Sequence, residues 1–379
     1  MPAVRAVTVA PGLRVWLVSG YAEARAALSD HRLRKDSRQL AALLHHRRIS
    51  AVAGLFQDGL SHHMLNTDPP EHERLRRLVS REFSVRRVTA LRPRITEISH
   101  ALMDGFPGRP WVDFIEAFAV PLPVTVICEL LGVPAEDRMT FRSWTNLFVS
   151  ARATAEMRQA AAATSAYLRD LVRAKRKHPG DDLITGLVTR RDGQDSLTED
   201  EVAAMAVLLL AAGHETTVNL LGNGLLALLT NPDQMAALRA DRSLLRGAVE
   251  ELLRYDSPVN QATLRFTAGP VDVGGVTIPE DEFVVVSVDA ANHDPAQFPQ
   301  PDRLDLRRDG GGDGGGHLSF GHGIHFCLGA ALARCEAEIA FSGLLDRFRR
   351  IELAVPVDRL EWRESAVMRG LRELPIRVA

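Results

Sequence analysis

Cysteine and lysine are both scarce in this 379-residue sequence, and each scarcity excludes a class of protein. Three cysteines provide no disulfide framework, which is typical of a protein in a reducing cytoplasm. All but three of the 46 basic residues are arginine, and the formal net charge of −2 gives no indication of nucleic-acid binding.

The sequence also has no pattern of a signal peptide or of a membrane anchor. Pro2, Pro11 and Gly12 interrupt the N-terminus, and the longest apolar run, Val202 to Gly213, is shorter than a membrane span. We therefore expect a cytoplasmic protein without a membrane anchor.

One cysteine lies in an unusual loop, Phe-Gly-His-Gly-Ile-His-Phe-Cys-Leu-Gly from Phe320 to Gly329. A run of good helix formers, Ala330 to Phe348, follows it, so Cys327 faces the positive pole of a helix, which favours a thiolate. The glycines allow tight turns and the approach of a flat, bulky group. Phe320 and Phe326 would exclude water, and a shielded anionic sulfur suits an iron centre.

The loop resembles the cysteine-ligand loop of cytochromes P450, whose pattern is Phe-x-x-Gly-x-x-x-Cys-x-Gly. Phe320, Gly323, Cys327 and Gly329 fill every fixed position. A lone cysteine is more often a small apolar filler of the core, so four further segments that match in the right order carry the identification. The resemblance implies one haem b with Cys327 as its iron ligand and with Phe320, Gly321 and Gly329 beside it.

A second segment, Glu251-Leu252-Leu253-Arg254, resembles the family's Glu-x-x-Arg motif. Glu251 and Arg254 lie on one helical face and can pair, although an isolated match would be an ordinary surface ion pair. The family adds a second arginine from a later loop, and Arg303 in Pro301-Asp302-Arg303-Leu304 fits that place. We therefore expect a buried network of these three residues.

A third segment, Ala212-Gly213-His214-Glu215-Thr216-Thr217, resembles the family's oxygen-binding motif. Gly213 and the two threonines have low helix propensity for an interior turn. Threonine hydroxyls can also compete for backbone carbonyls and open the helix locally. The alternative is a tolerated glycine in a buried helix. The resemblance implies that Glu215 and Thr216 deliver protons to bound oxygen.

Four cationic residues match the grip on the haem propionates. His72 and Arg76 are four residues apart, so they share one face of a helix. Arg265, between two strand-like runs, and His325, two residues before the cysteine, match the family's other propionate ligands. Each alone would be an ordinary surface or capping residue.

Helical patterns dominate, and strand patterns cluster after Pro258. Helices are expected over Tyr21–Leu28, Glu71–Ser80, Thr89–Gly105, Phe118–Gly132, Glu136–Val149, Ala155–Lys177, Glu199–Leu229 and Leu244–Tyr255. Strands are expected over Val15–Val18, Ala262–Thr267, Val271–Val273, Val276–Ile278 and Phe283–Val288. Thr198 and Glu201 form a capping box, and Gly310–Gly316 is an insertion before the cysteine loop.

Three other interpretations remain open at this point. The run Gly222 to Ala227 formally matches a dinucleotide-binding pattern, but it follows a helix instead of a strand. A zinc site could draw on His317, His322, His325, Cys327 and Cys335, but paired cysteine spacing is missing. A haem sensor would need no proton relay, which Glu215 and Thr216 resemble.

We predict a mainly α fold with a small β region, the cytochrome P450 fold, as a single domain over residues 1–379 with a shortened N-terminus. The implied activity is a haem-thiolate monooxygenase that inserts one oxygen atom from O2 into a hydrophobic substrate, in bacterial secondary metabolism; epoxidation or oxidative coupling is the alternative. Ferredoxin and ferredoxin reductase are the implied electron donors, docking near Arg74 and Arg77. Family position puts the substrate pocket at Ile49–Asn66, Ser150–Glu156, Leu208–Ala212, Val259–Thr263 and Ala366–Met368.

Overall fold

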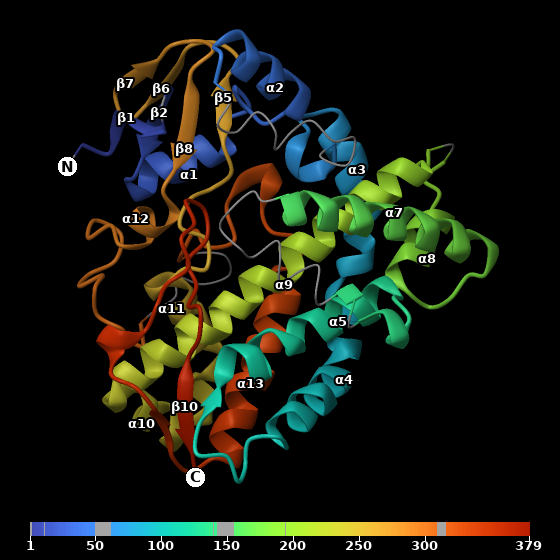
Figure 1. Ribbon diagram of the computed structural model, residues 1–379. Coiled ribbons are helices and arrows are strands. Elements are labelled where there is room, and N and C mark those ends of the chain that lie inside the picture. The colour runs from blue at the N-terminus through green and yellow to red at the C-terminus, as the bar shows by residue number, and fades with distance from the viewer. Residues whose placement is uncertain are drawn as a thin grey trace.

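The structure, a computed structural model, describes residues 2–10, 12–49, 62–138, 140–141, 155–193, 195–308 and 316–379, and helices dominate it (Figure 1). The described helices are α1 (Tyr21–Ser29), α2 (Ser37–His46), α3 (Glu71–Ser80), α4 (Val85–Met103), α5 (Pro121–Leu131), α7 (Ala155–Lys177), α8 (Leu183–Thr189), α9 (Glu199–Thr230), α10 (Pro232–Ala240), α11 (Leu245–Tyr255), α12 (Val288–Asn292) and α13 (Ala330–Arg347). The described strands are β1 (Val4–Ala10), β2 (Leu13–Val18), β3 (Leu33–Arg34), β4 (Val112–Asp113), β5 (Arg265–Thr267), β6 (Val271–Val273), β7 (Val276–Ile278), β8 (Phe283–Val286), β9 (Ile351–Leu353) and β10 (Pro375–Val378).

The predicted mainly α fold is confirmed, and most predicted helices lie where the pattern put them. α3 and α7 have the predicted bounds, while α9 and α11 each differ at one end by one residue. α4 begins at Val85, ahead of the predicted Thr89, and α5 begins only at Pro121 because a π-helical turn, Ile115–Ala119, precedes it. Most of the helix predicted over 136–149 lies outside the described residues.

A five-stranded sheet in the order β1-β2-β8-β5-β3 forms the largest β region (upper left in Figure 1). β2 pairs with β8 in parallel, and β5 pairs with both β8 and β3 in antiparallel fashion. Leu33 lies opposite Thr267 in this register. The chain that leaves β3 therefore runs beside β5, which carries Arg265.

The long helix α9 is the centre of the helical part. It begins with the predicted capping box, because Thr198 accepts from the Glu201 amide and Glu201 accepts from the Thr198 amide. α9 packs against α5, α7, α11 and α13, and its side chains are buried on nearly every face of its second half. One described helix, α9, has the length and apolar composition of a membrane span, but most of its apolar window is buried in the fold, as in a core helix.

Two glycines of α9 serve this packing and not a phosphate. A Cβ on Gly222 would lie 2.6 Å from Ile115 Cδ1, and one on Gly224 would lie 2.8 Å from Phe341 Cζ. Both glycines are therefore needed for close helix packing. The dinucleotide-binding interpretation is wrong, because this segment is the buried interior of a helix.

Helix α13 buries a carboxyl group, that of Glu336, which is only 2% exposed. Its Oε2 has no hydrogen-bond partner among the described residues. Burial raises the pKa of Glu336 to about 8. The folded protein thus keeps a proton that the unfolded chain releases above its ordinary pKa of 4.5, so this group's contribution to stability is lost as the pH rises from 4.5 to 8.

We predict that Glu336→Gln makes the protein less sensitive to this rise in pH, because the amide cannot ionise. Relative to the parent, the variant should gain on the order of 4 kcal/mol in free energy of unfolding between pH 5 and pH 8. Urea unfolding followed by circular dichroism at both pH values measures the difference. An identical pH dependence in the two proteins would contradict burial of a neutral Glu336.

Candidate functional site

A cavity of about 270 Å³ lies among α3, α9, β5 and the cysteine loop. It is far larger than the roughly 10–15 Å³ that one water needs, so its size suits an organic ligand. The predicted residues that line it are His72, Arg76, Thr216, Arg265, Phe320, Gly321, His325, Cys327 and Gly329. The fold thus brings every predicted cofactor-binding residue to one cavity.

Cys327 is held at the start of α13. Its amide donates to Phe320 O at 2.8 Å, and its sulfur accepts from the amides of Gly329 and Ala330. Burial raises the pKa of the Cys327 thiol, and these amides, with the guanidinium of Arg76, oppose the shift without cancelling it. The helix start therefore acts as predicted but does not produce a thiolate alone; a bound metal ion would deprotonate the sulfur outright.

Glycine is required in the cysteine loop for a different reason at each position. Gly321 and Gly323 have φ of +73° and +74°, a region that favours glycine. A Cβ on Gly323 would also lie 2.8 Å from Leu28 O at the end of α1. Gly329 has an ordinary φ of −84°, and a Cβ there would meet no atom of the chain within 4 Å. Gly329 lines the cavity, so glycine there leaves room for a ligand.

The four residues predicted to hold the propionates converge on the cavity from three parts of the fold. His72 and Arg76 come from α3, Arg265 from β5, and His325 from the turn before the cysteine. The rings of His72 and His325 are 4.4 Å apart between centroids, and Arg76 Nη2 donates to Phe326 O at 2.7 Å. Burial is the main cause that lowers the pKa of His72 to about 4 and that of Arg265 to about 10.

This cluster has unused hydrogen-bonding capacity that fits an anionic cofactor. Both ring nitrogens of His72 and Nε of Arg265 are buried and have no hydrogen-bond partner among the described residues. Leaving such groups unpaired is costly. The two carboxylates of a haem would accept hydrogen bonds from Arg265 Nε and from the one protonated ring nitrogen of His72, so the residues present fit the cofactor that the sequence implies.

Helix α9 contributes Thr216 to the cavity lining. Its hydroxyl donates to Ala212 O at 2.9 Å, and that of Thr217 donates to Gly213 O at 3.4 Å, so both compete for backbone carbonyls as predicted. The helix nevertheless continues without a break. Glu215 is not in the cavity lining; burial raises its pKa, and the charge of Arg363 opposes that shift.

The predicted buried network exists, but with a different third member. Glu251 accepts from Arg254 Nε at 2.8 Å and Nη2 at 2.9 Å, and from Arg308 Nε at 3.1 Å. Arg303 contributes only its backbone carbonyl, which accepts from Arg254 and from Arg308, while its own side chain is exposed. The assignment of Arg303 is therefore wrong, and Arg308 takes the role.

The adjacent Glu250 was missed by the sequence analysis. It accepts from Arg334 Nε at 2.6 Å and Nη2 at 2.7 Å and contacts His317 at 3.1 Å. Burial alone would raise the pKa of Glu250, but these hydrogen bonds outweigh it and hold the pKa at about 2. The guanidinium of Arg334 lies over the Phe320 ring, 4.4 Å from its centroid. The sequence signal that could have indicated this residue is a second carboxylate, Glu250, directly before Glu251.

The zinc interpretation lacks support from this geometry. His317 contacts Glu250, and His322 accepts from Arg25 Nε at 3.3 Å. No group of three metal-ligating side chains occurs in the part of the chain that the structure describes.

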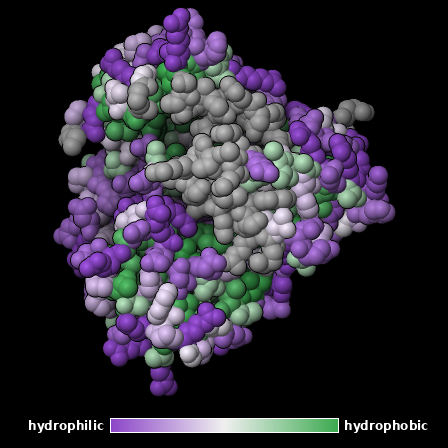
Figure 2. Space-filling view, viewed as in Figure 1, coloured by the Kyte–Doolittle hydropathy of each residue, from purple (hydrophilic) through white to green (hydrophobic). Residues whose placement is uncertain are grey.

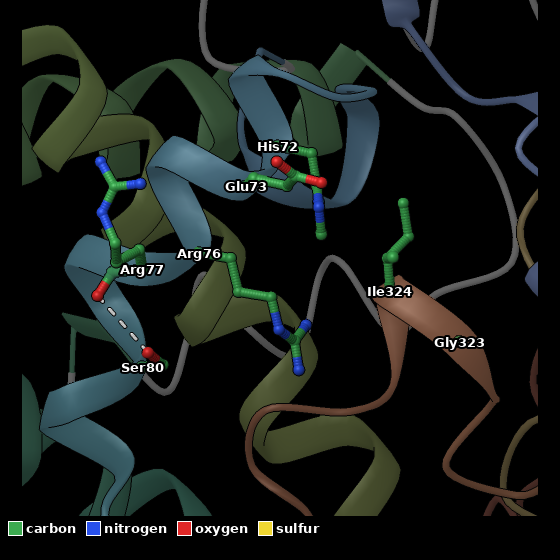
Figure 3. Close-up of a pocket in the computed structure, with 7 residues that line it drawn as sticks. All are labelled: His72, Glu73, Arg76, Arg77, Ser80, Gly323 and Ile324. Atoms are coloured by element: carbon green, nitrogen blue, oxygen red, sulfur yellow. Dashed lines mark hydrogen bonds between the residues drawn. The ribbon is translucent and has the colours of Figure 1, made fainter.

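A shallow groove on the outer side of α3 separates this helix from the cysteine loop (Figure 3). Arg76 points toward that loop, whereas Arg77 points away from it. Arg77 pairs with Asp192 at 2.5 Å, and Arg74 pairs with Glu201 at 2.7 Å. The positive charge expected at Arg74 and Arg77 is thus offset by acidic partners.

Parts of the predicted substrate pocket reach the cavity. Leu208, Ala212, Val259 and Thr263 line it, whereas Ala366–Met368 does not. Most of Ile49–Asn66, of Ser150–Glu156 and of Gly310–Gly316 lies outside the described residues. Figure 2 shows a mostly hydrophilic rim, with hydrophobic residues visible in the upper and lower parts of that face.

Comparisons with known proteins identify relatives over nearly the whole chain. The family model described as Cytochrome P450 matches residues 137–372. The chain is 50% identical to cytochrome P450 107B1 of Saccharopolyspora erythraea, over 99% of this chain and 92% of that protein. It is also 50% identical to the cytochrome P450 monooxygenase PikC of Streptomyces venezuelae, over 97% of this chain and 86% of PikC.

A solved structure gives the same result for the fold. The tirandamycin C-bound P450 monooxygenase TamI is 46% identical to this chain and superposes with a TM-score of 0.90. The match covers 100% of this chain and 94% of TamI.

We predict that alanine substitution of Arg308 destabilises the protein more than alanine substitution of Arg303. Glu251→Ala leaves two buried guanidiniums without their carboxylate and should cost about 3–5 kcal/mol of stability, with loss of haem-loaded protein. Arg308→Ala should cost less, because Arg254 still pairs with Glu251. Arg303→Ala, which keeps the backbone carbonyl, should stay within about 0.5 kcal/mol of the parent. Chemical unfolding of the three variants measures the order, and a cost for Arg303→Ala equal to that for Arg308→Ala would contradict the geometry.

Proposed function

The chain belongs to the cytochrome P450 family and is a haem-thiolate monooxygenase, and we propose that Cys327 is the cysteine that supplies the thiolate. The observation that carries this proposal is the position of Cys327: it lies just before α13 and lines the same cavity as Arg76 and Arg265. Cys335 and Cys128 are buried elsewhere, in α13 and α5, and neither lines the cavity.

We propose that the cofactor is haem b, held without covalent bonds. Covalent attachment uses a Cys-x-x-Cys-His segment, and this sequence contains no such segment. His72, Arg76, Arg265 and His325 would donate to the two propionates, and Phe320, Gly321 and Gly329 would border the ring. When bound, the thiolate-ligated haem iron activates O2, so that one oxygen atom enters the substrate and the other leaves as water.

The chain's own contribution to this reaction is to bind substrate, exclude water and supply protons. We propose that the Thr216 hydroxyl, in the cavity wall, would hold the last proton donor on the path into the cavity. Glu215 would supply protons from the other side of α9 through water, and the raised pKa that burial gives it suits a group that gives up and regains a proton.

We propose that the substrate is a hydrophobic product of bacterial secondary metabolism. The support is the apolar part of the lining of the cavity that also contains Cys327. It includes Met64, Ile127, Leu209 and Val259. The relative TamI binds tirandamycin C, as its description states. A sensor function receives no support, since the named relatives are monooxygenases.

We further propose that this single-domain, cytoplasmic protein takes its electrons from a ferredoxin and a ferredoxin reductase. The proposed docking face includes the groove between α3 and the cysteine loop, because Gly323 and Ile324 of the cysteine loop form part of its lining. Ile324, which is 42% exposed there, provides an apolar contact, and Arg76 provides charge in place of Arg74 and Arg77.

For Cys327→Ser, we predict loss of the thiolate signature from the absorption spectrum of the reduced carbon monoxide complex, because a serine hydroxyl cannot donate as strongly to iron. Cys335→Ser and Cys128→Ser are the matched controls and should keep the parent spectrum. An unchanged spectrum in Cys327→Ser, with a change in a control, would move the assignment to that cysteine.

Thr216→Ala should bind substrate and oxygen normally but waste electrons, because it removes a hydroxyl from the cavity wall without touching the ligand loop. We predict less product per NAD(P)H consumed and more hydrogen peroxide. Thr230→Ala is the matched control, since the Thr230 hydroxyl makes the same bond to a carbonyl four residues earlier, at 2.9 Å, far along the same helix. Equal coupling in Thr216→Ala and the parent would exclude Thr216 from proton delivery.

A further inference from the structure

Lys35 is a buried lysine that points into the haem cavity and that no motif identified. It lies between β3 and α2, is 3% exposed, and is part of the cavity lining beside Arg265 and His72. Its backbone position is fixed, because its amide donates to Asp68 Oδ1 at 3.1 Å and Oδ2 at 3.0 Å. Among the described residues, none accepts a hydrogen bond from its ammonium group.

Such a lysine is costly to the folded chain. Burial lowers the pKa of Lys35 well below its ordinary 10.5, and the charge of Arg265 lowers it further. Asp68 opposes the shift, but its oxygens already accept from the amides of Lys35 and Asp36. Lysines are almost never fully buried unless they are paired, so the position indicates an anion that occupies the cavity.

The charges around the cavity indicate which anion. Lys35, Arg76 and Arg265 are three cations, and Asp68 is the carboxylate that acts on both Lys35 and Arg265. His72, whose pKa is lowered to about 4, is neutral at pH 7. With Lys35 protonated, an excess of two positive charges remains, which matches the two negative charges of ionised propionates.

We propose that Lys35 is a direct ligand of a haem propionate, a third fixed cation in the grip formed by Arg76 and Arg265. The inference rests on the proposed haem site and adds a residue to it. β3 makes the contact possible, because its pairing with β5 carries Lys35 alongside Arg265.

The test uses the haem-loaded enzyme with Lys35→Met, Lys35→Arg and, as control, Lys177→Met, which changes an exposed lysine at the end of α7. Transfer of haem to excess apomyoglobin gives the rate of haem loss, and resonance Raman spectroscopy gives the propionate bending band. We expect Lys35→Met to lose haem about ten- to hundredfold faster than the parent, as the loss of one charge-assisted hydrogen bond predicts. Its propionate band should shift, and Lys177→Met should match the parent in both measurements.

Two results would overturn the proposal. One is a parental propionate band in Lys35→Met, even with faster haem loss, because the lysine would then act only on the packing of the fold. The other is haem loss from Lys35→Arg as fast as from Lys35→Met. Arginine keeps the positive charge, so the proposal expects Lys35→Arg to lose haem slowly. If Lys35→Met cannot be isolated with haem, haem loading in Lys35→Arg decides: loading supports the proposal, and no loading overturns it. The absorption spectrum of the parent protein separates the Lys35 proposal from the proposed haem site. If the parent lacks the haem-thiolate spectrum, the haem site itself is contradicted, whatever the Lys35 variants show.

Discussion

The cysteine loop depends on two adjacent carboxylates of α11. Glu251 binds Arg254 and Arg308 and so fixes the segment that precedes the loop. Glu250, on the neighbouring face, binds Arg334 in the helix that follows the cysteine. The loop is thus tied at both ends to one helix, while Ser319 Oγ donates to Leu253 O of the same helix at 2.7 Å. An iron ligand must stay at a fixed distance from its metal, and this bracing limits the freedom of the sulfur before any cofactor binds.

The second constraint is electrostatic, and it acts on the other rim of the cavity. Buried cations normally find anions within the chain, as Arg254 does with Glu251. Among the described residues, Asp68 is the carboxylate that acts on Lys35 and Arg265, and its oxygens already serve backbone amides. If a dianionic cofactor binds here as proposed, its binding would also stabilise the fold.

The sequence predicted those features that depend on local spacing. The helices α3 and α7 and the capping box of α9 follow from short periodicities or motifs. The convergence of the cofactor residues was expected from the resemblance of their segments to the cytochrome P450 family. Arg308 could not be found this way, because a loop of uncertain path decides which arginine side chain turns inward and which residue offers only its carbonyl. Lys35 was missed for a related reason: its role comes from the pairing of β3 with β5, strands far apart in sequence. Strands of two residues, such as β3 and β4, carry too little pattern to be predicted, whereas the three-residue strands β6 and β7 were predicted with their observed bounds.

Glu215 and Thr216 show how far neighbours in sequence can differ in position. Successive residues on a helix point about 100° apart, so a wall residue and its neighbour face different surroundings. Thr216 faces the cavity, while Glu215 faces Arg363 in the C-terminal part of the chain. The backbone carbonyls of Ala212 and Gly213 accept the hydroxyls of Thr216 and Thr217, so hydroxyl groups compete for the backbone in this turn. Helix α9 is thus the packed centre of the fold and, under the proposed roles, the partition between Glu215 and the cavity that Thr216 lines.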